Sequence, residues 1–599
     1  MTLKIASDIL ADHILIHHFF DRTTRPADYQ RQIIEPFLVL KPKEILTNLA
    51  EAEIKGESSE AGLLLGQKLD ELRRIVNRED NIARWNVLHW LEDVAYLRPD
   101  DMLAIVAPIV DGPERPPATY QAMVLDKAVD ILSRTIYQGS LRDAITYLHR
   151  LTRYRPEANE YARVREKAHN ALVDIAALQP GKQYAMQLTL LERISVWLEQ
   201  DFGGNLGLSL ALLRSMLSIQ FMNAGTDPTK PFNVYFQRGV LRPDESLRRI
   251  RDHALDILYQ VYRRASSLSE RLKIVQALDG AVPQIALSFQ GSTETRAWLQ
   301  PDCVKTTRFF SEVVVPEAEL PILDAVAKWL WRARRFGGYQ AEELEHLRQQ
   351  IQDHSSYQLY RILVRWHRSD EDDDQSNWRA RRQEAVERYL EELSPSTMER
   401  AIRDLDTIAE QARSAGESGA NWFNVLLRKL GEGYPNLARQ LIEQTVAEGL
   451  TLKHYLSFVI AGLRRGAPDT AWAYIEAWLA RDDPTLWLAV ASTYRCVGWS
   501  GLQTHEWDVL RRLAAKGSAS VDLEIIGPTW RFAPYNPDFA VELLKMLAAR
   551  GDESILGYVA KGLTWPDDTP NGWAVKFTNL QDYLDIGSPG IPVVDHKLL

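Results

Sequence analysis

Cysteine is nearly absent from this chain of 599 residues, which contains only Cys303 and Cys496. Two cysteines so far apart in the sequence exclude a disulfide framework and a paired-cysteine metal site, and the reducing cytoplasm is the expected location. The sequence also lacks any run of 18 or more apolar residues, so we expect no membrane-spanning helix. Asp8 and Asp12 interrupt the first apolar stretch, which is unlike a secretory signal.

Neither sign of charge dominates. The chain has 71 basic and 81 acidic residues, which gives a formal net charge of -10. A protein that sheathes nucleic acid presents a strongly basic face, whereas basic pairs here, such as Arg248–Arg249 and Arg511–Arg512, are interspersed with acidic residues. We interpret these pairs as solvated helix faces or local contacts with an anion, and we predict no nucleic-acid partner.

The familiar catalytic patterns are also missing. The only Gly-Lys pair, Gly181–Lys182, is not followed by the serine or threonine of a phosphate-binding loop. The segment Gly416–Gly419 resembles a hydrolase nucleophile turn only superficially, because we expect it between helices. His13 and His17 are four residues apart and could share a helix face as zinc ligands do, but no glutamate follows His13 and no cysteine is near. We therefore predict no enzyme, cofactor or metal, and keep an enzyme built around this histidine pair as a minor alternative.

A nine-residue pattern recurs in the first half of the chain. Each copy begins with a β-branched residue, has an acid, a base and an alanine at places three to five, and ends in leucine; the copies are Val124–Leu132, Val164–Leu172 and Ile250–Leu258. They start 40 and then 86 residues apart, and we interpret 86 as two units of 43. This interval is typical of stacked HEAT-like helical hairpins. Ile82–Leu88 is a looser copy, and Leu206–Met216 supplies the apolar helix expected near residue 207, without the acid-base-alanine triplet.

A shorter period follows in the second half. Tyr434–Ile442, Ala467–Ile475 and Asn536–Leu544 align without gaps, and their prolines are 33 and 69 residues apart. This spacing predicts TPR-like units of about 34 residues, each with a proline at the first position of a helix. His505–Leu513 provides the amphipathic helix of the intervening unit.

Two segments interrupt the helical pattern. The stretch Phe232–Leu241 alternates apolar and polar residues, which predicts a short β-hairpin with Gly239 near its turn. Insertions in solenoids fall on one face, often the binding face. The run Val313–Pro316 is a candidate for a short strand.

These patterns predict an all-α protein, an α-solenoid of HEAT-like and then TPR-like helical hairpins with a small β-hairpin insertion. The expected divisions are an N-terminal helical segment (1–78), a HEAT-like array with the insertion near 232–241 (79–290), an irregular helical connector (291–417), and a TPR-like array with a loose C-terminal tail (418–599). Each unit must bury its apolar face against the next, which leaves the outer faces of the array for partners.

Aromatic residues indicate where a partner would bind. Nine of the 17 tryptophans follow residue 421, and we expect most of them, including Trp472 and Trp478, to fill repeat cores. Aromatic residues in turns are harder to bury, and tryptophan and tyrosine are enriched in binding hot spots. The predicted protein-binding residues are the turn aromatics and two aromatics of the insertion: Trp499, Trp530, Tyr535, Phe232 and Tyr235.

Two segments resemble a known family. Ile5–Leu15 resembles a segment that follows the winged-helix part of bacterial STAND NTPases, although Ala6–Ser7 stand where a proline is frequent. Phe236–Leu241 together with Ile250–Ala254 resembles the helical-repeat sensor of such proteins, those of the antiphage Avs type in particular. The NTPase motifs themselves are missing, so no catalytic residue carries over.

The resemblance implies the sensor part of a STAND-type antiphage system, which would bind a phage protein or work with an NTPase or effector in trans. From the residues alone, we predict a non-enzymatic protein-binding α-solenoid. The alternative is a structural scaffold of a constitutive bacterial complex. The oligomeric state and the binding face stay open.

Overall fold

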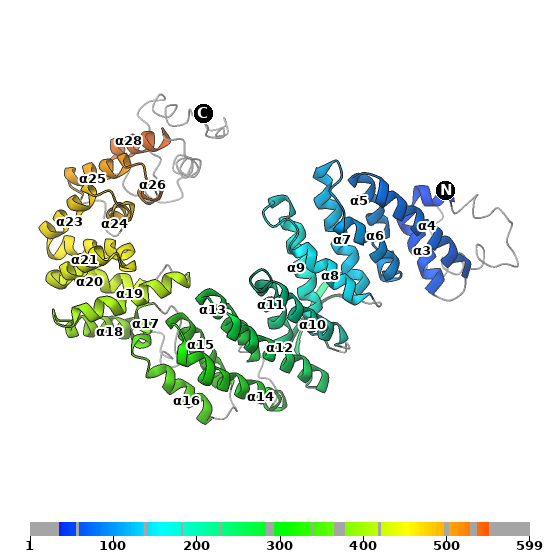
Figure 1. The fold of residues 1–599 in the computed structure, drawn as a ribbon, viewed down its shortest axis with the longest axis horizontal. Helices are drawn as coiled ribbons and strands as arrows, with labels where there is room; N and C mark the ends of the chain where they lie inside the picture. Colours follow the sequence, from blue (N-terminus) through cyan, green and yellow to red (C-terminus); the bar gives the residue numbers. More distant parts are fainter. Residues whose placement is uncertain are drawn as a thin grey trace. The chain divides into compact units, whose positions relative to one another are not determined.

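The computed structural model describes residues 35–54, 59–136, 140–180, 184–227, 230–282, 293–336, 341–364, 378–416, 421–495, 502–526 and 536–549. These residues form helices and a single two-stranded sheet, which confirms the predicted all-α helical-repeat fold (Figure 1). The helices divide into two compact units. The first contains residues up to Thr306 and Arg332–Gln340, and the second contains Thr307–Trp331 and the residues from Ala341 onward.

The first unit is a double row of antiparallel helices. One row consists of α3 (Pro42–Ile54), α5 (Asn81–Leu91), α7 (Gln121–Thr135), α9 (Ala162–Ala176), α11 (Phe202–Leu217) and α13 (Leu268–Ala277). The other consists of α4 (Ser59–Arg78), α6 (Pro99–Asp111), α8 (Leu141–Thr152), α10 (Ala185–Gln200) and α12 (Glu245–Arg264), while α2 (Glu35–Leu40) precedes the rows and α14 (Thr293–Phe309) follows them. Each helix packs on the next in its row and on a neighbour in the other row, as expected of stacked hairpins.

The recurring nine-residue pattern has two structural roles. Its apolar members fill the core, since Val124, Ala128 and Leu132 are fully buried. Its charged members form ion pairs between successive helices of the first row, as in the contact of 2.7 Å between Lys167 Nζ and Asp126 Oδ2. Although burial opposes the charge of Lys127, Glu92 and Asp130 raise its pKa.

We call these interhelical pairs the charge ladder. They are Lys43–Asp93 at 3.0 Å, Lys127–Glu92 at 3.1 Å, Arg134–Glu92 at 2.9 Å, Lys167–Asp126 at 2.7 Å and Lys167–Asp130 at 2.8 Å. The ladder connects α3, the two residues that follow α5 (Glu92 and Asp93), α7 and α9. It stops at α11, which has no charged residue before Arg214.

The third copy of the pattern does not lie where the spacing predicted. Ile250–Leu258 is in α12, which belongs to the second row, whereas α7 and α9 belong to the first. The interval of 86 residues is therefore not two complete repeats, because it includes the β-hairpin between α11 and α12. The pattern recurs because Ile250, Ala254 and Leu258 are fully buried, as their counterparts are, and because Asp256 again pairs with the following helix through Lys305 at 2.6 Å.

The second unit is also built from helical hairpins. Its described helices are α15 (Leu320–Phe336), of which the residues up to Trp331 belong to this unit, and then α16 (Ala341–Gln352), α17 (Ser355–Leu363), α18 (Trp378–Glu392), α19 (Met398–Ser414), α20 (Asn421–Gly433), α21 (Pro435–Glu448), α22 (Leu456–Gly466), α23 (Pro468–Ala480), α24 (Pro484–Arg495), α25 (Thr504–Ala515), α26 (Ala519–Ile526) and α28 (Pro537–Ala548). Pro435, Pro468 and Pro537 each begin a helix, which confirms that prediction. The helix expected at His505–Leu513 is α25.

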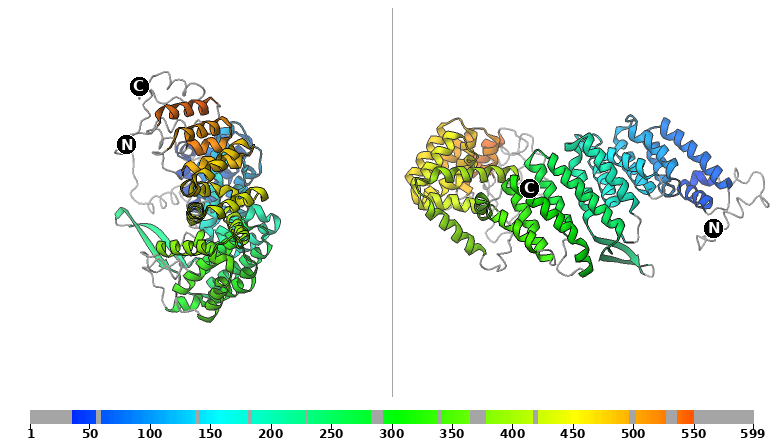
Figure 2. Two further views of the ribbon diagram at one scale, coloured as in Figure 1. Left: turned by 90° about the vertical axis from the view of Figure 1, so that its left-hand side faces the viewer. Right: turned by 60° about the horizontal axis from the view of Figure 1, so that its bottom comes forward.

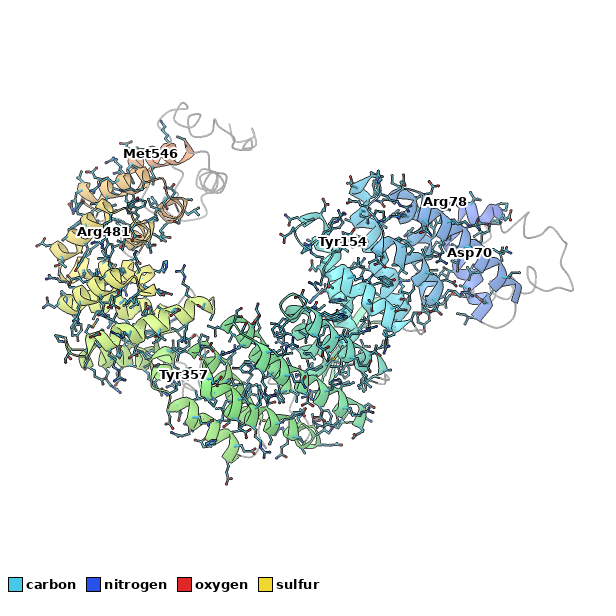
Figure 3. The ribbon with its side chains drawn as sticks, viewed as in Figure 1. Asp70, Arg78, Tyr154, Tyr357, Arg481 and Met546 are labelled. Atoms are coloured by element: carbon cyan, nitrogen blue, oxygen red, sulfur yellow. The ribbon has the colours of Figure 1, made fainter. Side chains whose placement is uncertain are left out.

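Side chains fill the interior of the second unit (Figure 3). Tyr357, labelled there, is 2% exposed, and its hydroxyl donates a hydrogen bond of 3.2 Å to Asp324. Trp478 is buried as predicted, whereas Trp472 is only half-buried and lies edge-on to His505. The suggested strand at Val313–Pro316 is wrong: a π-helical turn (Phe310–Val314) and a 3₁₀ turn (Val315–Glu317) continue α14, because Phe310, Val314 and Val315 are buried against the helices.

The β-hairpin is present, but its turn lies elsewhere. Strands β1 (Gln220–Asp227) and β2 (Lys230–Val240) pair antiparallel, so most of the stretch Phe232–Leu241 belongs to one strand. Gly239 does not turn the chain. It pairs with Phe221, and a Cβ at Gly239 would come within 2.6 Å of the Phe221 ring, so glycine is needed there for close approach.

Candidate protein-binding site

The β-hairpin projects from the helices of the first unit (Figure 2). Its root is firmly fixed, because Ile219 and Leu241 are 2% and 3% exposed and the Leu241 amide donates a hydrogen bond of 2.8 Å to the Ile219 carbonyl. Immediately after the hairpin, the Asp244 side chain accepts a hydrogen bond of 2.7 Å from the Leu247 amide and caps α12. The projection therefore has a rigid base formed by the end of α11 and the start of α12.

Only some of the predicted binding residues can be placed. Phe232 and Tyr235 both lie on β2, and the pairing register sets Tyr235 opposite Gly225. Trp499, Trp530 and Tyr535 lie outside the described residues, as do His13 and His17. The structure therefore places the two aromatics of the insertion on one strand, three residues apart and so on opposite faces of it, and does not test the other three predicted residues.

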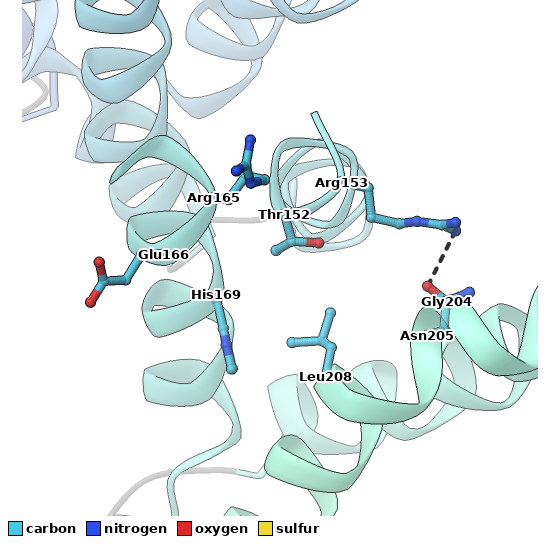
Figure 4. A pocket seen from close by; sticks show the side chains of 8 residues that line it. All are labelled: Thr152, Arg153, Arg165, Glu166, His169, Gly204, Asn205 and Leu208. Atoms are coloured by element: carbon cyan, nitrogen blue, oxygen red, sulfur yellow. Dashed lines mark hydrogen bonds between the residues drawn. The ribbon is translucent and has the colours of Figure 1, made fainter. Parts of the chain in front are cut away.

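A cavity of about 300 Å³ adjoins α11 where the charge ladder stops (Figure 4). It lies between the end of α8, the first half of α9 and the start of α11. Its lining residues are Thr152, Arg153, Arg165, Glu166, His169, Gly204, Asn205 and Leu208. Helix α11 begins with Phe-Gly-Gly-Asn-Leu-Gly, so the residues by which it lines the cavity, Gly204, Asn205 and Leu208, are all uncharged.

One wall of the cavity is a closed hydrogen-bond network. The Asn205 amide donates a bond of 2.6 Å to the Trp197 carbonyl, and its oxygen accepts bonds from His149 at 2.9 Å and Arg153 at 3.4 Å. Figure 4 shows Arg153 directed toward Asn205, and Arg153 also pairs with Asp201, the N-cap of α11. These groups satisfy one another and hold α8, α10 and α11 together.

The opposite wall has hydrogen-bonding capacity to spare. Both ring nitrogens of His169 are shielded from solvent and have no hydrogen-bond partner among the described residues. Arg165 uses one terminal nitrogen for the carbonyls of Tyr154, Arg155 and Ala158, at 3.2, 2.8 and 3.0 Å. With Leu208 and the exposed Glu166 at its edge, the cavity combines an apolar contact with donors and acceptors, which suits a polar side chain of another molecule.

Sequence reasoning missed this cavity because its walls come from three helices separated along the chain. A signal was nevertheless present. The apolar helix Leu206–Met216 lacks the acid-base-alanine triplet, and two glycines, Gly203 and Gly204, stand just before it. A break in a repeated pattern is therefore informative about surface features as well as about the repeat itself.

We expect acid to weaken the first unit through His149, which stacks on Trp197 with ring centroids 4.0 Å apart. Burial lowers the pKa of His149, the hydrogen bond to Asn205 opposes this effect, and the charge of Arg153 adds to it. The unfolded histidine takes up a proton below about pH 6.5 that the folded ring resists, so stability is lost as the pH falls.

The expected result is a fall in melting temperature between about pH 7.5 and 5.5 that is smaller in His149→Gln. His253→Gln is the control, since His253 is exposed on α12. An equal pH response in His149→Gln and the unmodified protein would contradict this account of His149.

No group of three or more His, Cys, Asp or Glu side chains within the described part of the chain is arranged to hold a metal ion. Across the same residues, no helix is both long and apolar enough to cross a membrane. No protein-family model matches the chain, and no curated protein shows significant sequence similarity to it.

Proposed function

We propose that this chain is a non-enzymatic, cytoplasmic α-solenoid that binds a protein partner, and that the docking site consists of the β-hairpin, which follows the end of α11, and the cavity at the start of the same helix. The observation that carries the proposal is a two-stranded projection with a buried, hydrogen-bonded root. An isolated hairpin is only marginally stable in water, so a projection of this length on a rigid helical base is best explained by something that it contacts.

The cavity is a second observation that supports the same proposal. It lies at the start of α11, whose other end leads into β1, so a partner that extends along this helix could contact the hairpin and also place a side chain in the cavity. Specific interfaces are typically anchored by a few side chains in well-packed pockets. Arg165 and the exposed Glu166, which line the cavity, give such an anchor charged groups to bind.

The resemblance to STAND sensors suggests the class of partner. In that case the partner is a phage protein, or an NTPase or effector that acts in trans after the phage protein has bound. The alternative is a scaffold that holds a constitutive complex, and the charge ladder favours it, since ion pairs between successive helices stiffen the array. A partner that co-purifies only after phage infection supports the sensor, and one that is always bound supports the scaffold.

Removal of the projection should abolish partner capture. We would join Phe221 to Gly239, which are paired across the hairpin, through a short Gly-Ser turn. Affinity purification with mass spectrometry, from infected and uninfected cells, should then lose the partner by tenfold or more in recovery, on the order of 1.4 kcal/mol in binding. Full recovery would contradict the proposed docking site.

The cavity can be tested separately by filling it. Leu208→Trp adds volume at the cavity wall and should lower partner recovery while the melting temperature stays unchanged. Gly203→Ala is the matched control on the same helix, because a Cβ there meets nothing within 4 Å and Gly203 does not line the cavity. Equal recovery by both variants would remove the cavity from the docking site and leave the hairpin alone.

A further inference from the structure

The pairing register of the hairpin defines which backbone groups face outward. The hydrogen bond from the Leu241 amide to the Ile219 carbonyl makes these two residues a hydrogen-bonded pair. In an antiparallel ladder such pairs alternate with pairs whose N–H and C=O groups point away from each other. From the register, Phe221–Gly239 and Asn223–Gln237 bond inward, whereas the backbones of Met222, Ala224 and Thr226 on β1 point to its open edge. The backbone N–H and C=O of Gln220 point the same way, but each forms a hydrogen bond of 3.3 Å with the Ser218 hydroxyl.

That edge is open within the described residues, because the sheet there has only two strands. Proteins normally protect an exposed edge with charged side chains, proline or a bulge. Strand β2 has such features in Lys230, Pro231 and Arg238. Strand β1 has no charge and no proline from Gln220 to Thr226, and its only irregularity lies at its far end, between Thr226 and Asp227. The two edges of one hairpin therefore differ, and only the β1 edge is suited to accept another strand.

We propose that the occupant of the β1 edge is β1 of a second copy of this chain, paired antiparallel about a two-fold axis. The result is a four-stranded sheet with the order β2–β1–β1–β2. A two-fold interface requires a surface that is complementary to itself. An uncharged strand meets this requirement, because like charges directly opposite each other destabilise a strand pair and none would meet here.

The arrangement also agrees with the other properties of the hairpin. Three or more strands are generally needed for a sheet to be stable on its own, and pairing of two copies supplies four. The hairpin projects from the helices, so its edge is accessible to another copy (Figure 2). Strand β2, with Phe232 and Tyr235, becomes the outer strand on each side and stays accessible to a different protein. The inference does not depend on the proposed function, since it requires no partner other than the chain itself.

Two proline substitutions in the same residue pair test the inference. Ala224 and Phe236 are opposite each other, and the backbone N–H of each points outward, one to each edge. Proline removes an outward N–H without breaking the bonds inside the hairpin, as in natural edge strands. Ala224→Pro therefore blocks the β1 edge, and Phe236→Pro blocks only the β2 edge.

The mass of the full chain in solution is the readout, measured by light scattering after gel filtration and by sedimentation. We expect the unmodified protein and Phe236→Pro to have about twice 68.4 kDa, and Ala224→Pro to have 68.4 kDa with an unchanged melting temperature. A monomeric unmodified protein at about 100 μM, or a dimeric Ala224→Pro, would overturn the inference. So would two proline variants that behave alike, whether both are monomeric or both dimeric. Partner capture by monomeric Ala224→Pro, measured separately, distinguishes failure of this pairing from failure of the proposed function.

Discussion

Asp302→Ala is expected to destabilise the first unit by about 3–5 kcal/mol, the cost of leaving a buried charge without its partner. Arg251 is fully buried, and its Nε donates a hydrogen bond of 2.7 Å to Asp302, which is itself 1% exposed. Arg248 pairs with the other carboxylate oxygen of Asp302, and its guanidinium lies 4.3 Å from the centroid of the Trp298 ring. Without Asp302, two guanidinium groups would remain next to each other, one of them out of reach of water.

Hydrogen exchange along α12 measures this effect, because local opening of the helix reports its loss of stability. The matched control is Asp256→Ala, which breaks an ion pair between the same two helices. Asp256 and Lys305 are 53% and 40% exposed, so their pair at 2.6 Å should contribute about 1 kcal/mol or less. Similar exchange in the two variants would show that burial does not distinguish these two ion pairs.

Gly462→Ala is expected to destabilise the second unit by about 3 kcal/mol, the upper part of the range for overpacking. Helices α20 and α22 approach so closely that their backbones are in contact. A Cβ at Gly462 would overlap the Arg428 carbonyl oxygen and lie 2.9 Å from the Glu432 nitrogen. Because the obstacle is backbone, no side-chain rotation can relieve the clash, and the two helices must move apart.

The control for this substitution is in the partner helix. A Cβ at Gly433, at the end of α20, meets nothing within 4 Å, so Gly433→Ala should be neutral or stabilise by about 0.5–1 kcal/mol through the lower entropy of the unfolded chain. The melting temperature and the exchange rates of α20 and α22 give the comparison. An equal effect of the two substitutions would mean that helix propensity, not close packing, decides the outcome at both sites.

The elements that could be predicted from the sequence are those specified by local chemistry. A proline at the first helical position needs no distant partner, and Pro435, Pro468 and Pro537 all begin helices. The alternation in Phe232–Leu241 likewise identified a strand. Its partner β1 was missed because Gln-Phe-Met-Asn-Ala-Gly-Thr-Asp has few residues that favour strands, and its pairing with β2 is what makes it one.

Features that depend on several helices were beyond local patterns. The cavity needs His169 from α9 and Asn205 from α11, which the chain brings together only after α10 has been added between them. The row of the third repeat copy was misjudged for a related reason. The pattern describes a buried helix flanked by ion pairs, and both rows offer that environment, so the pattern alone does not say which row a helix joins.

The guanidinium of Arg251 has a mechanical consequence. It donates hydrogen bonds to the carbonyls of Leu217, at the end of α11, and of Ala281, in addition to its bond with Asp302 in α14. Leu217 is three residues before β1 begins. A force on the hairpin is therefore transmitted from the end of α11, through the guanidinium of Arg251, to Asp302 in α14. Because this group is held by three partners, the base of the hairpin should move little under such a force.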